Sequence, residues 1–177
     1  MKKLFFLVLF AGLIFTADAQ SFSKMDGSPM DAVYFPGRRD GAPKLRVLYS
    51  RPQKKDRDIF GGLLAYGDMW RVGANEATEI LFLTDAKING TSVKAGRYTI
   101  YAIPNESEWE VFFSSDVDKW GHYQFDPSAS TVAKITVPTA KTPSTVEAMS
   151  IVFEAVDNGA HMIIGWDDTM VRVPIEI

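Results

Sequence analysis

The chain is predicted to be all-β, an antiparallel β-sandwich of about eight strands with a long irregular loop at residues 51–78. Short β-favouring runs recur from residue 44 to the end of the 177-residue sequence. Turn-forming pairs such as Asn89-Gly90 and Asn158-Gly159 separate several of these runs, and no convincing helix of ten residues interrupts them. Many short strands with such turns indicate a sandwich, and an open barrel is the alternative.

Residues 1–19 are predicted to be a signal peptide. Two lysines precede an apolar run at residues 4–15, and Ala17-Asp18-Ala19 forms a small-x-small cleavage site before Gln20. The apolar run is too short for a membrane anchor, which needs about 20 residues. We therefore expect an exported protein that does not span the membrane and acts in the periplasm or outside the cell.

Composition excludes several classes of function. The chain has no cysteine, so it has no disulfide, thiol nucleophile or cysteine metal ligand. Without Lys2, Lys3 and Asp18, the 19 basic and 22 acidic residues become 17 and 21, which leaves a net charge of −4. A mildly acidic chain without a basic run is a poor partner for nucleic acid. The 158 residues after cleavage suffice for one domain, and the oligomeric state cannot be deduced.

Residues 20–43 are rich in Gly, Pro, Ser and Asp and are predicted to be an extended arm, attached to the domain through Tyr34-Phe35. The sandwich domain then occupies residues 44–177. In its first strand, residues 44–50, the residues Leu45, Val47 and Tyr49 share one face. The other expected strands lie at residues 79–84, 86–93 (broken by Asn89-Gly90), 97–103, 109–114, 132–137, 146–156, 161–166 and 169–177.

The last two strands are expected to be joined by a hairpin turn at Asp167-Asp168. In the strand at residues 169–177, alternation puts one apolar set on a single face, namely Val171, Val173, Ile175 and Ile177. Pro174 cannot donate to a strand ladder, so an edge or a bulge is expected there. The only helical candidates are short turns within residues 60–72 and around residues 116–120.

The segment at residues 49–78 is the best candidate for a functional site. Trp70, Arg71, Asn75 and Glu76 lie close together outside the regular strands. They are interpreted either as a recognition surface, with an indole face beside convergent polar groups, or as a brace that satisfies the backbone of a covering loop. The sequence leaves both interpretations open.

The assembled motifs resemble one family, catalogued as domain of unknown function 2911. They comprise Tyr49-Ser50-Arg51-Pro52, the run at residues 57–62, Tyr66-Gly67, the run at residues 70–78, the turn at residues 94–98, Trp109, and Trp120-Gly121 with Tyr123. The family usually has glycine before the arginine, where this chain has Asp56. The resemblance implies an exported β-rich protein of the kind found in Bacteroidetes-type bacteria, and it implies no established activity.

Three further residues complete the expected site. Arg51 follows a strand and could hold an anion, a carboxylate ligand or Asp58, in a positive patch that includes Arg57 and two lysines. Trp120 is expected to stack on a ligand, and His122 to line the cleft. The two histidines of the chain lack metal-site spacing, so no metal and no cofactor is expected. No nucleophile motif is present, and no catalytic residue is assigned.

These observations favour a non-catalytic protein that binds a small molecule or a glycan. One alternative is a glycan-directed hydrolase that uses Glu76 and Asp68 as acid and base. The other is a structural or assembly protein of the cell envelope whose exposed strand edge pairs with a partner.

Overall fold

The structure is a computed structural model that describes residues 20–177. The predicted signal peptide, residues 1–19, lies outside the described residues. Nine strands form one antiparallel sheet in the order β1-β2-β3-β6-β7-β8-β9-β4-β5. Their bounds are β1 (Met30–Phe35), β2 (Leu45–Ser50), β3 (Glu79–Phe82), β4 (Ala86–Ile88), β5 (Thr91–Val93), β6 (Gly96–Pro104), β7 (Glu108–Ser114), β8 (Thr131–Val156) and β9 (Gly159–Glu176).

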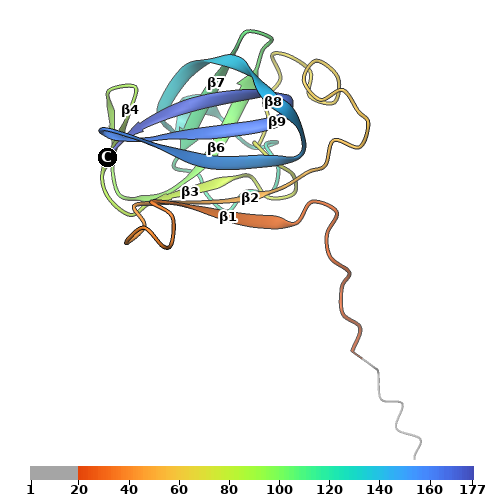
Figure 1. Cartoon of the computed structure of the whole chain (residues 1–177), viewed down its shortest axis with the longest axis horizontal. Coiled ribbons are helices and arrows are strands. Elements are labelled where there is room, and N and C mark those ends of the chain that lie inside the picture. Colours follow the sequence, from red (N-terminus) through yellow and green to blue (C-terminus); the bar gives the residue numbers. More distant parts are fainter. Residues whose placement is uncertain (1–19) are drawn as a thin grey trace, which may run out of the picture.

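The sheet folds over itself through β8, and this makes two layers. Residues 131–138 of β8 pair with β7, whereas its residues 139–156 pair with β9. The strands β1, β2 and β3 therefore lie on one side of the core, and the β8–β9 ribbon lies on the other (Figure 1). The sheet is not closed, and its two layers confirm the predicted all-β sandwich.

The core is built from alternate residues of the strands, as the sequence pattern predicts. Leu45, Val47 and Tyr49 of β2 are buried, and so are Val171, Val173 and Ile175 of β9. Burial of each large apolar side chain contributes about 1.5–3 kcal/mol to folding. The two faces that enclose this core thus follow directly from a period of two residues in the sequence.

The ribbon of β8 and β9 differs from the expectation. Residues 131–156 form one strand instead of two, and Asp167-Asp168 is not a hairpin turn but part of the continuous strand β9. The register shifts on β8 between residues 141 and 150, and Asp167 opposite them has a φ of 56°. A bulge in a long ribbon uses the same left-handed residue as a turn does, and this explains the wrong prediction.

The chain ends and connections also depart in part from the sequence pattern. Within the predicted arm, Met30–Phe35 forms the edge strand β1, which pairs with β2. The one helix of the described residues is α1 (Pro127–Ser130), capped by Asp126, whereas the turns expected within residues 60–72 and 116–120 form no helix. Residues 20–177 include no helix long and apolar enough to cross a membrane.

The segment at residues 51–78 is irregular, as predicted. It contains no strand or helix and touches the sheet through isolated bridges, among them Gln53 with Ala148 and Trp70 with Ala102. Because these partners belong to β8 and β6, the segment joins the two layers at one end of the sandwich (Figure 1). The sequence prediction of a long loop outside the strands is therefore confirmed.

Replacement of Gly159 by Ala is expected to destabilise the protein by about 3 kcal/mol. Gly159 has a φ of 152°, and an added Cβ would lie 2.0 Å from the carbonyl oxygen of Ile175. The matched control is Gly27→Ala, because nothing lies within 4 Å of a Cβ built at Gly27. Urea unfolding of both variants measures the difference, and equal stability of the two would contradict this account of the β9 contact.

Candidate functional site

Trp70 anchors the irregular segment in the core. Its backbone pairs with Ala102, with the Trp70 amide 2.7 Å from the Ala102 oxygen and the Ala102 amide 2.9 Å from the Trp70 oxygen. Its indole is only 3% exposed, packs against Trp109 and Trp166, and donates to the Gly73 oxygen at 3.1 Å. Trp70 is thus first a structural brace, and part of its side chain also lines a neighbouring cavity.

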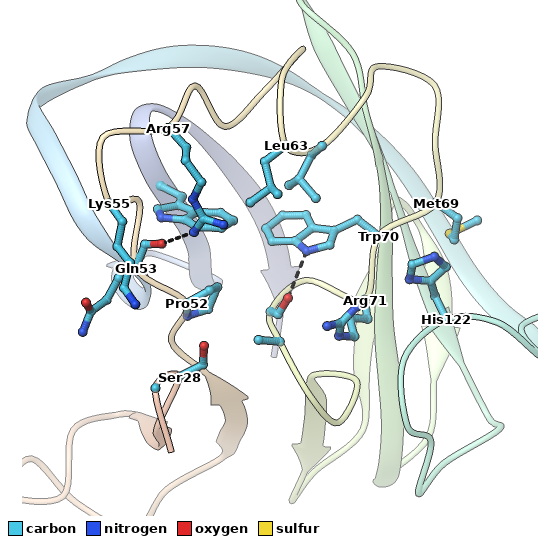
Figure 2. Close-up of a pocket in the computed structure, with 15 residues that line it drawn as sticks. Ser28, Pro52, Gln53, Lys55, Arg57, Leu63, Met69, Trp70, Arg71 and His122 are labelled. Carbon is cyan, nitrogen blue, oxygen red and sulfur yellow. Dashed lines mark hydrogen bonds between the residues drawn. The ribbon is translucent and has the colours of Figure 1, made fainter. Parts of the chain in front are cut away.

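A cavity of about 520 Å³ lies beside this indole. Figure 2 shows Trp70 and Arg71 at its centre, Lys55 and Arg57 on one side and His122 on the other. Three lining residues are cationic, and no Asp or Glu belongs to the lining. The described chain as a whole is acidic, so the positive charge of this cavity is opposite in sign to the net charge of the protein.

The guanidinium of Arg71 has no partner within the described residues. Its Nε is buried and makes no hydrogen bond, and no carboxylate forms an ion pair with it. The Nδ1 of His122, which lines the same cavity, is also buried without a partner. Because buried polar atoms are nearly always hydrogen-bonded, two unpaired nitrogen atoms beside one cavity are unusual.

Charge and burial also act on His122. Desolvation lowers the pKa of His122 below its ordinary 6.5, and the neighbouring charge of Arg71 lowers it further, while Asp68 opposes both. The imidazole is therefore mainly neutral at pH 7. Proton uptake by His122 is disfavoured mainly because burial penalises the charged imidazolium, and the positive charge of Arg71 adds to this effect.

The far wall of the cavity is shaped by an unusual backbone. Lys55 and Asp56 both have left-handed conformations, with φ values of 50° and 56°. Both residues thus adopt a backbone conformation that glycine adopts more readily. Arg57 then turns its guanidinium onto the backbone, where it donates to the Lys54 oxygen at 2.8 Å and the Gln53 oxygen at 2.5 Å.

Arg51 lies outside the cavity and holds strands together. Its Nε donates to the Met149 oxygen at 3.1 Å, and one terminal nitrogen donates to the Ser150 hydroxyl at 2.7 Å. The other terminal nitrogen forms an ion pair with Asp31 of β1 at 3.0 Å. The guanidinium thus joins the edge strand β1, the end of β2 and the middle of β8.

Asn75 and Glu76 lie away from Arg71 as well. Asn75 has a φ of 57°, and its amide donates to Asp26 of the N-terminal arm at 3.0 Å. Glu76 is exposed, forms no ion pair within residues 20–177, and borders a smaller depression of about 180 Å³. The structure does not bring these two side chains to the cavity that contains Arg71.

Trp120 and His122 belong to one loop but point to different concave sites. His122 faces the cavity, whereas Trp120 is 67% exposed and borders a separate groove of about 360 Å³. Among the seven expected site residues, the structure therefore brings together three, Trp70, Arg71 and His122. The others are Arg51 in a brace, Asn75 and Glu76 in a turn, and Trp120 in the groove.

The two carboxylates of the hydrolase alternative border different depressions. Asp68 lines a shallow one of about 340 Å³ together with His122, and Glu76 lines the depression of about 180 Å³. In the described part of the chain no three His, Asp or Glu side chains gather in a way that could hold a metal ion. The arrangement offers positive charge and an aromatic edge rather than an acid and base pair.

Part of the cavity lining was not predicted from the sequence. Lys55 was expected only as one of two lysines in a positive patch near Arg57, and no role was predicted for Ser28 of the arm or for Met69, although all three line the cavity. The positive patch around Arg57 was the usable signal for the first of these. No local pattern could have identified Ser28, because it reaches the cavity only when β1 pairs with β2.

The chain belongs to the family described as "Protein of unknown function (DUF2911)", which matches it over residues 28–175. The family resemblance expected from the motifs is therefore confirmed. No curated protein and no solved structure matches the chain significantly.

Replacement of Arg51 by Met is expected to lower stability by about 2 kcal/mol, because the Met149 oxygen and Asp31 lose their donor. Arg39→Met is the control, since Arg39 is exposed and makes no side-chain hydrogen bond in the described residues. Thermal unfolding compares them. An Arg51→Met protein as stable as the control would show that the brace is dispensable.

Proposed function

We propose that this member of the DUF2911 family is a non-catalytic binding protein whose ligand is a small organic anion. The observation that carries the proposal is the guanidinium of Arg71, which lies at the cavity without an ion pair or hydrogen bond within residues 20–177. A guanidinium binds planar carboxylate or phosphate groups through two parallel hydrogen bonds. The unsatisfied Nδ1 of His122 adds a second group that can hydrogen-bond to the same anion.

The sign of the local charge supports an anionic ligand. Lys55, Arg57 and Arg71 line the cavity without a carboxylate, although residues 20–177 carry a net charge of −4. Random placement of charges on an acidic protein would put carboxylates on this surface too. A cavity wall of one sign raises the local concentration of ions of the opposite sign.

The remaining lining supports an apolar group on the ligand. Leu63, Met69, Trp70 and Trp166 lie around the cationic residues. At about 520 Å³ the cavity falls within the range of about 300–1,000 Å³ that is usual for small-molecule sites. An organic acid or phosphate ester with one ring fits this combination of charge, apolar surface and size.

Export is part of the same proposal. The motif at residues 1–19 would place the cavity in the periplasm or outside the cell, where a binding protein could capture a diffusing anion. Two edge strands of six and three residues offer little backbone to a partner, which favours ligand binding over strand-mediated assembly.

The decisive substitution is Arg71→Met, tested by thermal shift. Benzoate and phenyl phosphate are expected to raise the melting temperature of the unaltered protein, by about 2–4 °C for each kcal/mol of binding. Benzamide, the neutral analogue of benzoate, is expected to have no effect. Arg71→Met should abolish the shifts, and its unliganded form should be as stable as the parent or about 1 kcal/mol more stable, because an unpaired buried donor is removed.

The control for this test is Arg172→Met. Arg172 is exposed on β9, 3.7 Å from Glu154, and does not line the cavity. Its replacement changes the net charge as Arg71→Met does, so it should leave the anion-induced shift intact. Equal shifts in the parent and in Arg71→Met, or none with either anion, would refute the proposal.

Binding is also expected to strengthen as the pH falls. In the free protein the pKa of His122 lies below 6.5, and a bound anion would raise it by stabilising the imidazolium. Proton uptake on binding means that affinity increases as the pH falls from the pKa of His122 in the bound state toward its lower pKa in the free state. NMR titration of the imidazole protons measures the shift, with His161, which does not line the cavity, as the internal reference.

A further inference from the structure

A second concave site lies on the other side of the loop that carries His122. This aromatic groove has a volume of about 360 Å³, and Trp120, Tyr123, Gln124 and Tyr101 are among its lining residues. Two of its aromatic rings face solvent, since Trp120 is 67% and Tyr123 is 76% exposed. Large aromatic side chains that stay in water beside a groove are unusual on a protein surface and mark interaction sites.

The floor of the groove is rigid. Tyr101 of β6 is buried and stacks on Phe125 with ring centroids 4.0 Å apart and an interplanar angle of 16°. This pair belongs to a small second apolar cluster with Phe112, on the face of the sheet that points away from the main core. The loop at residues 118–125 therefore covers the outside of the sheet and is held there by packing.

The backbone that carries the two exposed rings is also held in place. The Gly121 amide donates to the Asn75 oxygen at 3.1 Å, and the Ala77 amide donates to the Lys119 oxygen at 2.8 Å. Gly121 has a φ of 73°, and a Cβ built there would lie 2.5 Å from the ring of Tyr123. The Tyr123 ring thus lies directly against the Gly121 backbone. A ligand would meet a fixed backbone and a Tyr123 ring that is already packed, which reduces the conformational entropy lost on binding.

The charged groups of the groove are already compensated. Asp118 accepts from Arg97 at 2.8 Å, and Lys119 forms an ion pair with Asp116 at 2.9 Å. Gln124 is exposed, and its side chain makes no hydrogen bond within the described residues. What remains for a ligand is aromatic surface bordered by uncharged polar groups, which contrasts with the cationic cavity on the other side of the loop.

We infer that this aromatic groove binds a neutral sugar ring of a glycan. A pyranose has an apolar face of C–H groups, which packs on an aromatic ring, and a rim of hydroxyl groups, which hydrogen-bond to amide and phenol side chains. Trp120 and Tyr123 supply the rings, and Gln124 and Tyr101 supply the hydrogen-bonding groups. A protein partner would need about 800 Å² of surface on each side, whereas this site is a small concavity.

Saturation-transfer NMR tests the inference with four neutral hexasaccharides, which are cellohexaose, xylohexaose, maltohexaose and chitohexaose, each at about 10 mM. At least one is expected to receive saturation at its ring protons. Trp120→Ala and Tyr123→Ala should each weaken that binding at least about tenfold, and Trp120→Tyr should restore most of it. Phe22→Ala is the control, because Phe22 is an exposed aromatic residue of the arm, distant in sequence from the groove.

The same variants separate this inference from the anion site. Arg71→Met should leave sugar binding unchanged, and Trp120→Ala should leave the benzoate-induced thermal shift unchanged. Failure of all four sugars to bind, or binding that survives Trp120→Ala, would overturn the inference. Self-association in sedimentation experiments that Trp120→Ala abolishes, without sugar binding, would assign the groove to a protein interface instead.

Discussion

The structure depends on the insertion of Trp70 between the layers of the sandwich. Its backbone hydrogen bonds with Ala102 make the irregular segment an extension of the sheet at that point, and its indole packs against Trp109 and Trp166 of the two layers. Neighbouring residues of an extended chain point to opposite sides. With Trp70 buried, Arg71 is therefore directed out of the core, to the wall of the cavity.

A structural role and a binding role are thus compatible in one segment. Trp70 and Arg51 satisfy the covering loop and tie the strands, as a brace requires. Arg71 makes no such bracing contact within the described residues. Its buried Nε has no partner, and local conflicts of this kind are expected at functional sites. The same separation occurs in the loop at residues 119–123, where His122 faces the cationic cavity and Trp120 faces the aromatic groove.

Local chemistry predicted the fold well and the site only in part. Alternating apolar residues in β2 and β9 correctly identified the core faces, because a period of two residues is a property of any strand. The Asn89-Gly90 turn was also predicted correctly, and both residues have the positive φ that such a turn needs. The prediction of a hairpin turn at Asp167-Asp168 was wrong because a bulge and a turn require the same backbone conformation. Only the pairing of β8 with β9 distinguishes the bulge from the turn.

The sequence by itself determined the all-β class, the family, the irregular segment and the residue types that make it distinctive. Each of these features depends on residue patterns that are local in the sequence. The tertiary structure alone decided which of those residues meet. In the folded chain Arg51 contacts β8, Asn75 contacts the N-terminal arm, and Glu76 is exposed. Lys55 and Ser28 line the same cavity as Arg71. The physical reason is that contacts between distant segments depend on strand order and register, and no short stretch of sequence encodes these.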